Sequence, residues 1–189
     1  MAFESVLVGS GEIFVAPVGE AFPDVDNAPG GNWESMGDID GGVTVNLNQT
    51  LDEHRVDDES GPIKATISEE DMQIVANLAE ATLENIGNAF DRQNPVVAAG
   101  PPAIKTNTLY RGVGVVTEMA LLFKTGSPYV LGTASNMQFE VPRAVQAGNI
   151  GPAFVKDGKT LIPVEFHALA DQSAPTAAEK FGRLIAQTA

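Results

Sequence analysis

The fold of this chain is decided by residues 68–91, SEEDMQIVANLAEATLENIGNAFD, where helix signals gather in a sequence that otherwise predicts strands. Two interpretations compete for this stretch. In the first, Ser68 and Asp71 approximate a helix capping box, although aspartate is shorter than the glutamate of that motif. One long helix would then carry apolar residues near helical spacing, namely Met72, Val75, Ala79 and Ile86.

The second interpretation is a strand followed by a short helix. Apolar residues recur with the period of two that is typical of a half-buried strand, at Met72, Ile74, Ala76 and Leu78. Thr82 would then cap a helix over 83–90, whose apolar residues share one face, Leu83, Ile86 and Phe90. Asn77, Thr82 and Gly87 are poor residues for the interior of a long helix. We therefore favour the strand and the short helix.

Alternating apolar and polar residues predict the other strands, at 12–18, 43–50, 62–67, 104–111, 115–123, 137–144, 160–169 and 181–187. Pro163 favours an edge position or a bulge for its strand, because proline cannot donate to a sheet ladder. Glycine, proline and charged residues predict irregular connections at 19–32, 51–61 and 92–103. The sequence thus predicts a mainly β fold, an antiparallel β-sandwich or barrel of about eight strands with one short flanking α-helix.

Length and composition favour one globular domain. A chain of 189 residues with 43% hydrophobic content can bury a proper core. Within residues 1–189 we expect an N-terminal arm at 1–11 and a long exposed loop at 51–61. The absence of cysteine excludes disulfides and thiolate chemistry. No apolar run approaches the ~20 residues of a membrane helix, and the N-terminal residues lack the pattern of a signal peptide.

Charge is unevenly distributed along the chain. Residues 1–91 hold 19 acids and two bases, whereas residues 92–189 hold six acids and nine bases, so net charges of −17 and +3 make up the total of −14. Such a chain should not grip nucleic acid, because that binding needs cationic groups that displace counterions. Two interpretations stay open: the acids keep the protein soluble, or the asymmetry helps one copy find the next.

Motifs that carry catalysis are missing from the sequence, which contains no GxSxG, GxxxxGK[ST] or HExxH. His54 falls in a charged loop and is expected at the surface, whereas His167 falls in a strand and is expected in the core or at an interface. The acidic groups at 52–53, 57–59 and 69–71 lack the register of a calcium loop. We expect no enzyme activity, no cofactor and no metal site.

Short motifs follow one another in a characteristic order, AP at 16–17, GEAFP at 19–23, a Trp33 to Gly37 segment, DGGV at 40–43, GPIKA at 61–65, LAEATLENI at 78–86, IPVEFHALAD at 162–171 and FG at 181–182. This order resembles that of the major tail proteins, or tail tube proteins, of long-tailed bacteriophages. The resemblance covers residues 12–184. None of the motifs is a catalytic signature, so the specificity of the resemblance lies in their order.

The resemblance implies a β-sandwich with a flanking helix, as in the tube protein of type VI secretion. Copies would form hexameric rings whose inner sheets join into one barrel, and the rings would stack into a tube that conducts DNA into the host. The implied partners are other copies, a tape measure protein, a tail terminator and passing DNA that is not tightly bound, with no membrane. The implied location is the virion tail, after assembly in the host bacterial cytoplasm.

Two sets of residues are candidates for these roles. The candidates for contact between stacked rings are Phe3, Val6, Leu7, Asp52, Glu53, His54, Arg55, Asp57, Asp58 and Glu59. The candidates for the wall of the lumen are Thr44, Asn46, Asn48, Lys64 and Thr66. One alternative is a capsid-decoration or adhesin-like β-sandwich that binds a partner without forming tubes. Another is a carbohydrate-binding or hydrolytic sandwich, against which the low aromatic content counts.

Overall fold

A computed structural model describes residues 11–90, 96–107, 116–127, 136–152, 154 and 158–188. The strands in these ranges are β1 (Glu12–Pro17), β2 (Glu34–Ser35), β3 (Ile39–His54), β4 (Lys64–Leu78), β5 (Val96–Ala98), β6 (Ile104–Thr106), β7 (Met119–Thr125), β8 (Met137–Gln146), β9 (Ile162–Ala168) and β10 (Arg183–Ala186). The helices are α1 (Leu83–Ala89) and a short 3₁₀ helix, η1 (Ala177–Glu179).

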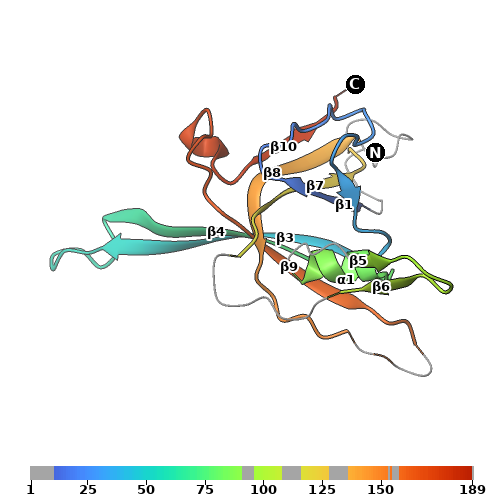
Figure 1. Cartoon of the computed structure of the whole chain (residues 1–189). Coiled ribbons are helices and arrows are strands. Elements are labelled where there is room, and N and C mark those ends of the chain that lie inside the picture. The colour runs from blue at the N-terminus through green and yellow to red at the C-terminus, as the bar shows by residue number, and fades with distance from the viewer. Residues whose placement is uncertain are drawn as a thin grey trace, which may run out of the picture.

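Every strand pairing in the described residues is antiparallel. One sheet has eight strands, with the order β2-β1-β7-β8-β9-β4-β3 and with β10 added beside β8, and β5 and β6 form a separate hairpin (Figure 1). The first half of β8 pairs with β7 and β10, whereas its last residues pair with β9. The predicted mainly β, antiparallel class with one short α-helix is confirmed.

The core lies where the two halves of this bent sheet face each other. Strands β1, β7 and β8 contribute one side of it, and β4 and β9 contribute the other, through buried residues such as Val15, Leu121, Ile74 and Phe166. A smaller cluster covers the outer face of β1 and β7, where the loop at 19–32 brings Phe22 against Trp33 with ring centroids 5.2 Å apart. Burial of these apolar side chains is the main source of stability.

The stretch at 68–91 forms a strand and then a short helix, as favoured from the sequence. Its first eleven residues belong to β4, which buries Met72, Ile74 and Leu78 on one face. Thr82 is the N-cap of α1, and its Oγ1 accepts a hydrogen bond from Asn85 N at 3.1 Å. The single long helix is therefore wrong, because period-two burial over 72–78 prevails over the weak capping signal at Ser68.

Two connections predicted to be irregular contain strand. β3 continues to His54 because residues 51–54 pair with 64–67, so the connection spans only 55–63 instead of 51–61. The segment at 92–103 contains β5, which pairs with β6. Gly100, Pro101 and Pro102 lie in the turn between the two strands, so composition averaged over the whole segment was misleading.

The strand predicted at 115–123 begins later and ends later than expected. β7 spans Met119–Thr125, and Lys124 lies within it instead of in a turn. The ammonium group of Lys124 is buried and donates to the carbonyl oxygens of Val25 and Asn27 at 3.1 and 2.6 Å. Burial lowers the pKa of Lys124 below its usual value, since desolvation disfavours the charged form.

The strand that contains Pro163 lies inside the sheet, so the expected edge position is wrong for β9 as a whole. Pro163 nevertheless pairs only with Asn77 of β4, because the pairing with β8 is confined to residues 166–168. Proline thus lies at a position where β9 is paired on one side only, so its missing N–H costs no hydrogen bond on the unpaired side. The strands expected at 12–18, 137–144 and 181–187 are confirmed by β1, β8 and β10, and the strand expected at 104–111 is confirmed over 104–106, while 108–111 lie outside the described residues.

Candidate assembly surface

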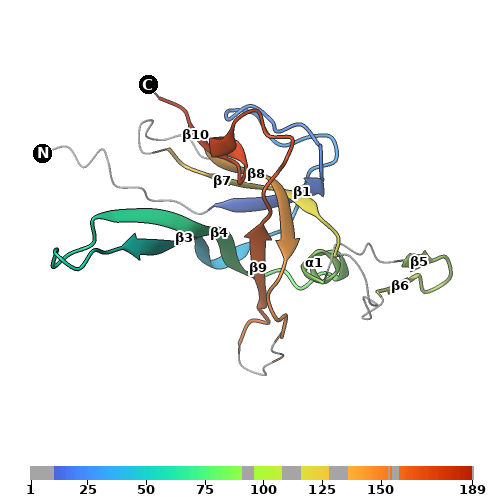
Figure 2. The same ribbon diagram turned by 90° about the vertical axis from the view of Figure 1, so that its left-hand side faces the viewer.

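The longest strands of the protein, β3 and β4, form a hairpin that projects beyond the rest of the sheet (Figures 1 and 2). Near the core, Val45 pairs with Ile74, which is buried. Farther out, every residue from 47 to 60 and from 62 to 70 is exposed. The outer part of the hairpin therefore has both faces in solvent in a single copy.

The projecting part is held together by its own hydrogen bonds. Ile63 N donates to His54 O at 2.9 Å, which closes the connection between the strands. The register shifts between Thr50 and Leu51, where Ser68 has no cross-strand partner and its Oγ donates to Thr50 O at 3.2 Å. This irregularity is a β-bulge, which increases local twist and fixes the register of the outer strands.

One face of the hairpin is polar. Directly paired residues of antiparallel strands point to the same side of the sheet, and the register places on this face Thr44, Asn46, Asn48, Thr50, Asp52 and His54 of β3 and Lys64, Thr66, Glu69, Asp71 and Gln73 of β4. All five residues that the sequence proposed for the lumen wall belong to this set. The structure brings them together on one surface, where carboxylates outnumber ammonium groups.

The polar face continues onto β9, which the sequence analysis did not include. Gln73 pairs with His167 and Val75 pairs with Glu165, so both β9 residues point to the same side. His167 Nε2 lies 2.9 Å from Glu165 Oε1, and its Nδ1 lies 3.5 Å from Asp71 Oδ1. The half-buried histidine thus has carboxylate partners on both ring nitrogens. The period-two pattern of 160–169 predicts the strand, but only the pairing of β9 with β4 places His167 on this face.

The opposite face of the outer hairpin carries exposed apolar residues between polar ones, Gln49, Glu53 and Glu70, and the sequence analysis missed it. Leu47, Leu51 and Ile67 point to this side and are 75%, 50% and 53% exposed. Leu51 and Ile67 are direct cross-strand partners, so they form a continuous apolar patch. The hairpin is amphipathic although neither face is buried, and exposed apolar patches of this kind mark interaction surfaces.

The tip of the hairpin carries the charged candidates for contact between rings. Residues 52–59 are all exposed, and the tip holds an ion pair in which Arg55 Nη2 donates to Glu53 Oε2 at 2.8 Å. This pair leaves Asp57, Asp58 and Glu59 without an ion pair among the described residues. The apolar candidates Phe3, Val6 and Leu7 lie outside the described residues.

The outer edge of β3 is a further unusual feature. β3 has 16 residues and stands last in the sheet order, with β4 as its only neighbour in the described part of the chain. A long, exposed edge presents unpaired backbone N–H and C=O groups that are ready to pair with another strand. The hairpin therefore offers three surfaces to another molecule: a polar face, an apolar face and a free edge.

The described residues offer little for chemistry. They contain no group of three or more histidine, aspartate or glutamate side chains placed to hold a metal ion. Within the same ranges, no helix is long and apolar enough to cross a membrane. The surfaces of the β3–β4 hairpin are suited to association with other molecules.

No family model and no curated protein sequence match this chain. Several solved structures are similar to it, and the following are two of them. One is the tube-terminating cap of the anti-feeding prophage, with 14% identity, a TM-score of 0.44 and coverage of 94% of this chain and 88% of that chain. The other belongs to the extended sheath–tube complex of PVC, an extracellular contractile injection system, with 14% identity, a TM-score of 0.43 and coverage of 94% and 88%. At these values the likeness is distant, and no functional conclusion is drawn from it.

Proposed function

We propose that this protein is a structural subunit of a bacteriophage tail tube, in which stacked hexameric rings form the conduit for DNA ejection. The observation that carries the proposal is the amphipathic β3–β4 hairpin, which projects from the core with both faces and one edge uncovered. A single copy has no use for such an element. The order of sequence motifs resembles that of tail tube proteins and supports the same role.

Ring formation follows from the free edge. Pairing β3 of one copy with the sheet of the next satisfies its unpaired backbone groups, and repetition around a closed ring leaves no edge exposed. The polar face of the hairpin then becomes the inner wall. Asp52, Glu69 and Asp71 on that face repel phosphates, so DNA slides past without being held.

Stacking of rings uses the outer part of the hairpin. The apolar patch formed by Leu47, Leu51 and Ile67 needs a cover, and the neighbouring ring supplies it. The acidic tip of each hairpin then meets a copy whose residues 92–189 carry net positive charge. The protein acts as part of the virion, with tape measure and terminator proteins as partners, and it is made and assembled in the host cytoplasm without an enzymatic role.

Negative-stain electron microscopy of the purified protein, concentrated at raised salt, tests the proposal. Salt screens the repulsion between acidic copies, so we expect hollow rings or tubes with a central channel. A fixed dimer without filaments at every salt concentration and in the presence of tail initiator proteins would instead support a decoration or adhesin-like role.

A further inference from the structure

A groove on the opposite side of the molecule is formed by none of the residues that the proposed tube uses. It lies on the outer face of the layer formed by β7, β8 and β10, where Phe22 packs, and its wall includes Glu140 and Pro142 of β8 and Arg183 of β10. Its part beside Arg183 has a volume of about 210 Å³, and a second part of about 320 Å³ continues toward Val18 and Gln172. Small-molecule sites usually have volumes of ~300–1,000 Å³, so the part beside Arg183 fits a single side chain.

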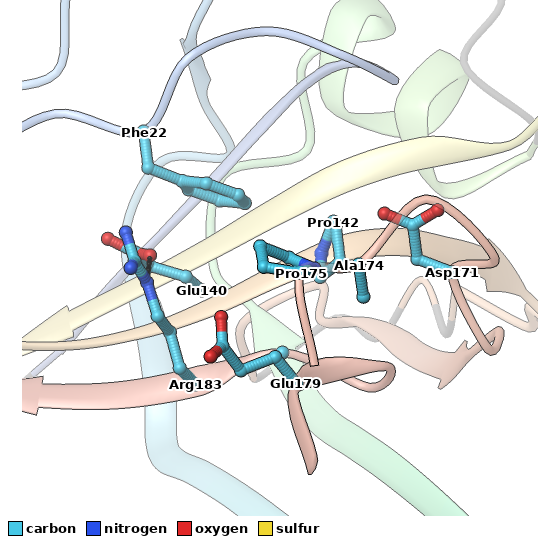
Figure 3. A pocket seen from close by; sticks show the side chains of 9 residues that line it. Phe22, Glu140, Pro142, Asp171, Ala174, Pro175, Glu179 and Arg183 are labelled. Atoms are coloured by element: carbon cyan, nitrogen blue, oxygen red, sulfur yellow. Dashed lines mark hydrogen bonds and ion pairs between the residues drawn. The ribbon is translucent and has the colours of Figure 1, made fainter. Parts of the chain in front are cut away.

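The walls of the groove combine apolar rings with carboxylates. Figure 3 shows the ring of Phe22 above the cavity and the rings of Pro142 and Pro175 behind it. Asp171 and Glu179 flank the opening. An aromatic face between carboxylates is the environment that favours a cation, since the ring quadrupole and the negative charges act in the same direction.

The cations of the groove are already in ion pairs. Arg183 donates to the carboxylate of Glu140, which is only 2% exposed, and Arg143 donates to Glu118 Oε2. The hydrogen bond that Arg183 donates to Glu140 raises the pKa of Arg183 above its usual value, so that guanidinium stays charged. Both positive charges are therefore neutralised, and the groove keeps a negative surplus.

The flanking carboxylates, in contrast, have no ion pair among the described residues. Asp171 Oδ1 accepts hydrogen bonds from the backbone N–H and the hydroxyl of Ser173 at 2.9 and 2.8 Å. These bonds lower the pKa of Asp171 below its usual value, so the group is ionised at neutral pH. Glu179 Oε1 accepts only from Thr176 Oγ1, at 3.1 Å. Both groups are held in place by local bonds, and each also interacts electrostatically with an arginine of the groove, Asp171 with Arg143 and Glu179 with Arg183.

We infer that this groove binds an arginine-bearing segment of a partner protein. The guanidinium lies between the Phe22 ring and the carboxylates of Asp171 and Glu179, and an apolar neighbour packs on Pro142. Within the described residues, a second copy of this chain is a poor occupant, because Arg55 lies among acids that the groove repels and Arg143 and Arg183 are already in ion pairs. The partner is therefore a different protein that reaches the outer face, and the inference does not depend on tube formation.

The test uses the full chain and two fluorescent peptides, acetyl-Ala-Leu-Arg-Pro-Leu-Ala-amide and the same peptide with citrulline in place of arginine. Citrulline keeps the shape of arginine and removes its charge. We expect the arginine peptide to bind and to shift the backbone amide signals of residues 171–183 and of Phe22 in NMR spectra. The citrulline peptide should bind at least about tenfold more weakly.

Matched variants separate the groove from general acidity. The double variant Asp171→Asn, Glu179→Gln keeps hydrogen-bond acceptors for Ser173 and Thr176. It should lower the affinity for the arginine peptide by about tenfold. The control variant Asp58→Asn, Glu59→Gln removes the same charge from the hairpin tip and should leave binding unchanged. Equal binding of the citrulline peptide, equal loss in the control variant, or signal shifts centred on the hairpin would overturn the inference.

Discussion

At the scale of single residues, Thr82 has a role that both sequence and structure define. Its side chain accepts the hydrogen bond from Asn85 N that begins α1, and no other side chain serves that amide in the described structure. Changing Thr82 to Ala should lower the free energy of unfolding by about 1 kcal/mol. Urea denaturation measures this free energy. The variant Thr82→Ser keeps the hydroxyl, so its free energy of unfolding should fall by less than half as much. Equal losses in the two variants would contradict the capping role.

A second residue-scale prediction concerns the apolar patch on the hairpin. The double variant Leu51→Asn, Ile67→Thr removes apolar surface that is already in solvent, so the free energy of unfolding should change by only ~1 kcal/mol or less. Assembly into rings or tubes should be lost, because the patch would no longer pack on a neighbour. Electron microscopy and urea denaturation give the two readouts.

Leu184 provides the matched control for this pair. It lies on β10 and is exposed to a similar degree as Leu51, at 55% against 50%, but it is outside the hairpin. Leu184→Asn should leave both stability and assembly unchanged. If it prevented assembly as completely as the hairpin variant, the specific role of the Leu51–Ile67 patch would be disproved.

At the scale of elements, the sequence predicts well where burial imposes a period. The alternation at 72–78 identified β4, and Thr82 identified the start of α1, because core packing and a cap each leave a local signature. Strands are predicted poorly from the sequence where neither of their faces packs against the core, because burial then imposes no alternation of apolar and polar residues. β3 and β4 continue beyond residue 50 with both faces exposed. The charged composition of residues 51–54 therefore predicts a loop, although these residues pair with residues 64–67 of β4.

Candidate surface residues follow the same rule. The alternation of Thr44, Asn46 and Asn48 was enough to place them on one face. His167 and Glu165 joined that face only through the pairing of β9 with β4, which is a long-range contact that no local pattern contains. The Ser68 bulge likewise decides which side Ile67 takes, and a one-residue shift of register reverses every side chain beyond it.

Shortening the hairpin tests its role as an element. Leu51 pairs directly with Ile67, so replacing residues 52–66 by Asn-Gly should close the strands with a two-residue turn. The removed residues are almost all exposed and make no core contact, so the melting temperature should shift by only about 2–4 °C. Assembly should be abolished.

The β5–β6 hairpin supplies the control for this deletion. Ala98 pairs directly with Ile104, so residues 99–103 can be replaced by the same Asn-Gly turn. This variant should retain both the fold and assembly. Tubes formed by the shortened β3–β4 variant, seen by electron microscopy under the same conditions, would show that the outer hairpin is dispensable.

At the scale of the whole molecule, the two-layer fold separates surfaces of different character. The polar face of the hairpin and β9 lies on one side, and the groove near Arg183 lies on the other. A ring with the first side inward would leave the groove on its outer surface. One fold thus presents an acidic inner wall, a stacking element and an outer binding groove, and only the first two share residues, Asp52 and His54.

The acidic residues 1–91 have two explanations, attraction between copies and solubility. These explanations predict opposite effects on the rate of assembly when tip acids are neutralised. If the tip acids attract the neighbouring copy, the variant Asp57→Asn, Asp58→Asn, Glu59→Gln should assemble more slowly, by about threefold or more. Removing the same charge elsewhere, with Glu20→Gln, Asp24→Asn, Glu34→Gln, reduces only the overall repulsion and should speed assembly. Light scattering at ~0.05 M salt follows both rates. Near 1 M salt, where the screening length is about 3 Å, the variants should converge with the unmodified protein. If both variants assembled faster at low salt, the acids would serve solubility alone, and the tip would have no attractive role in stacking.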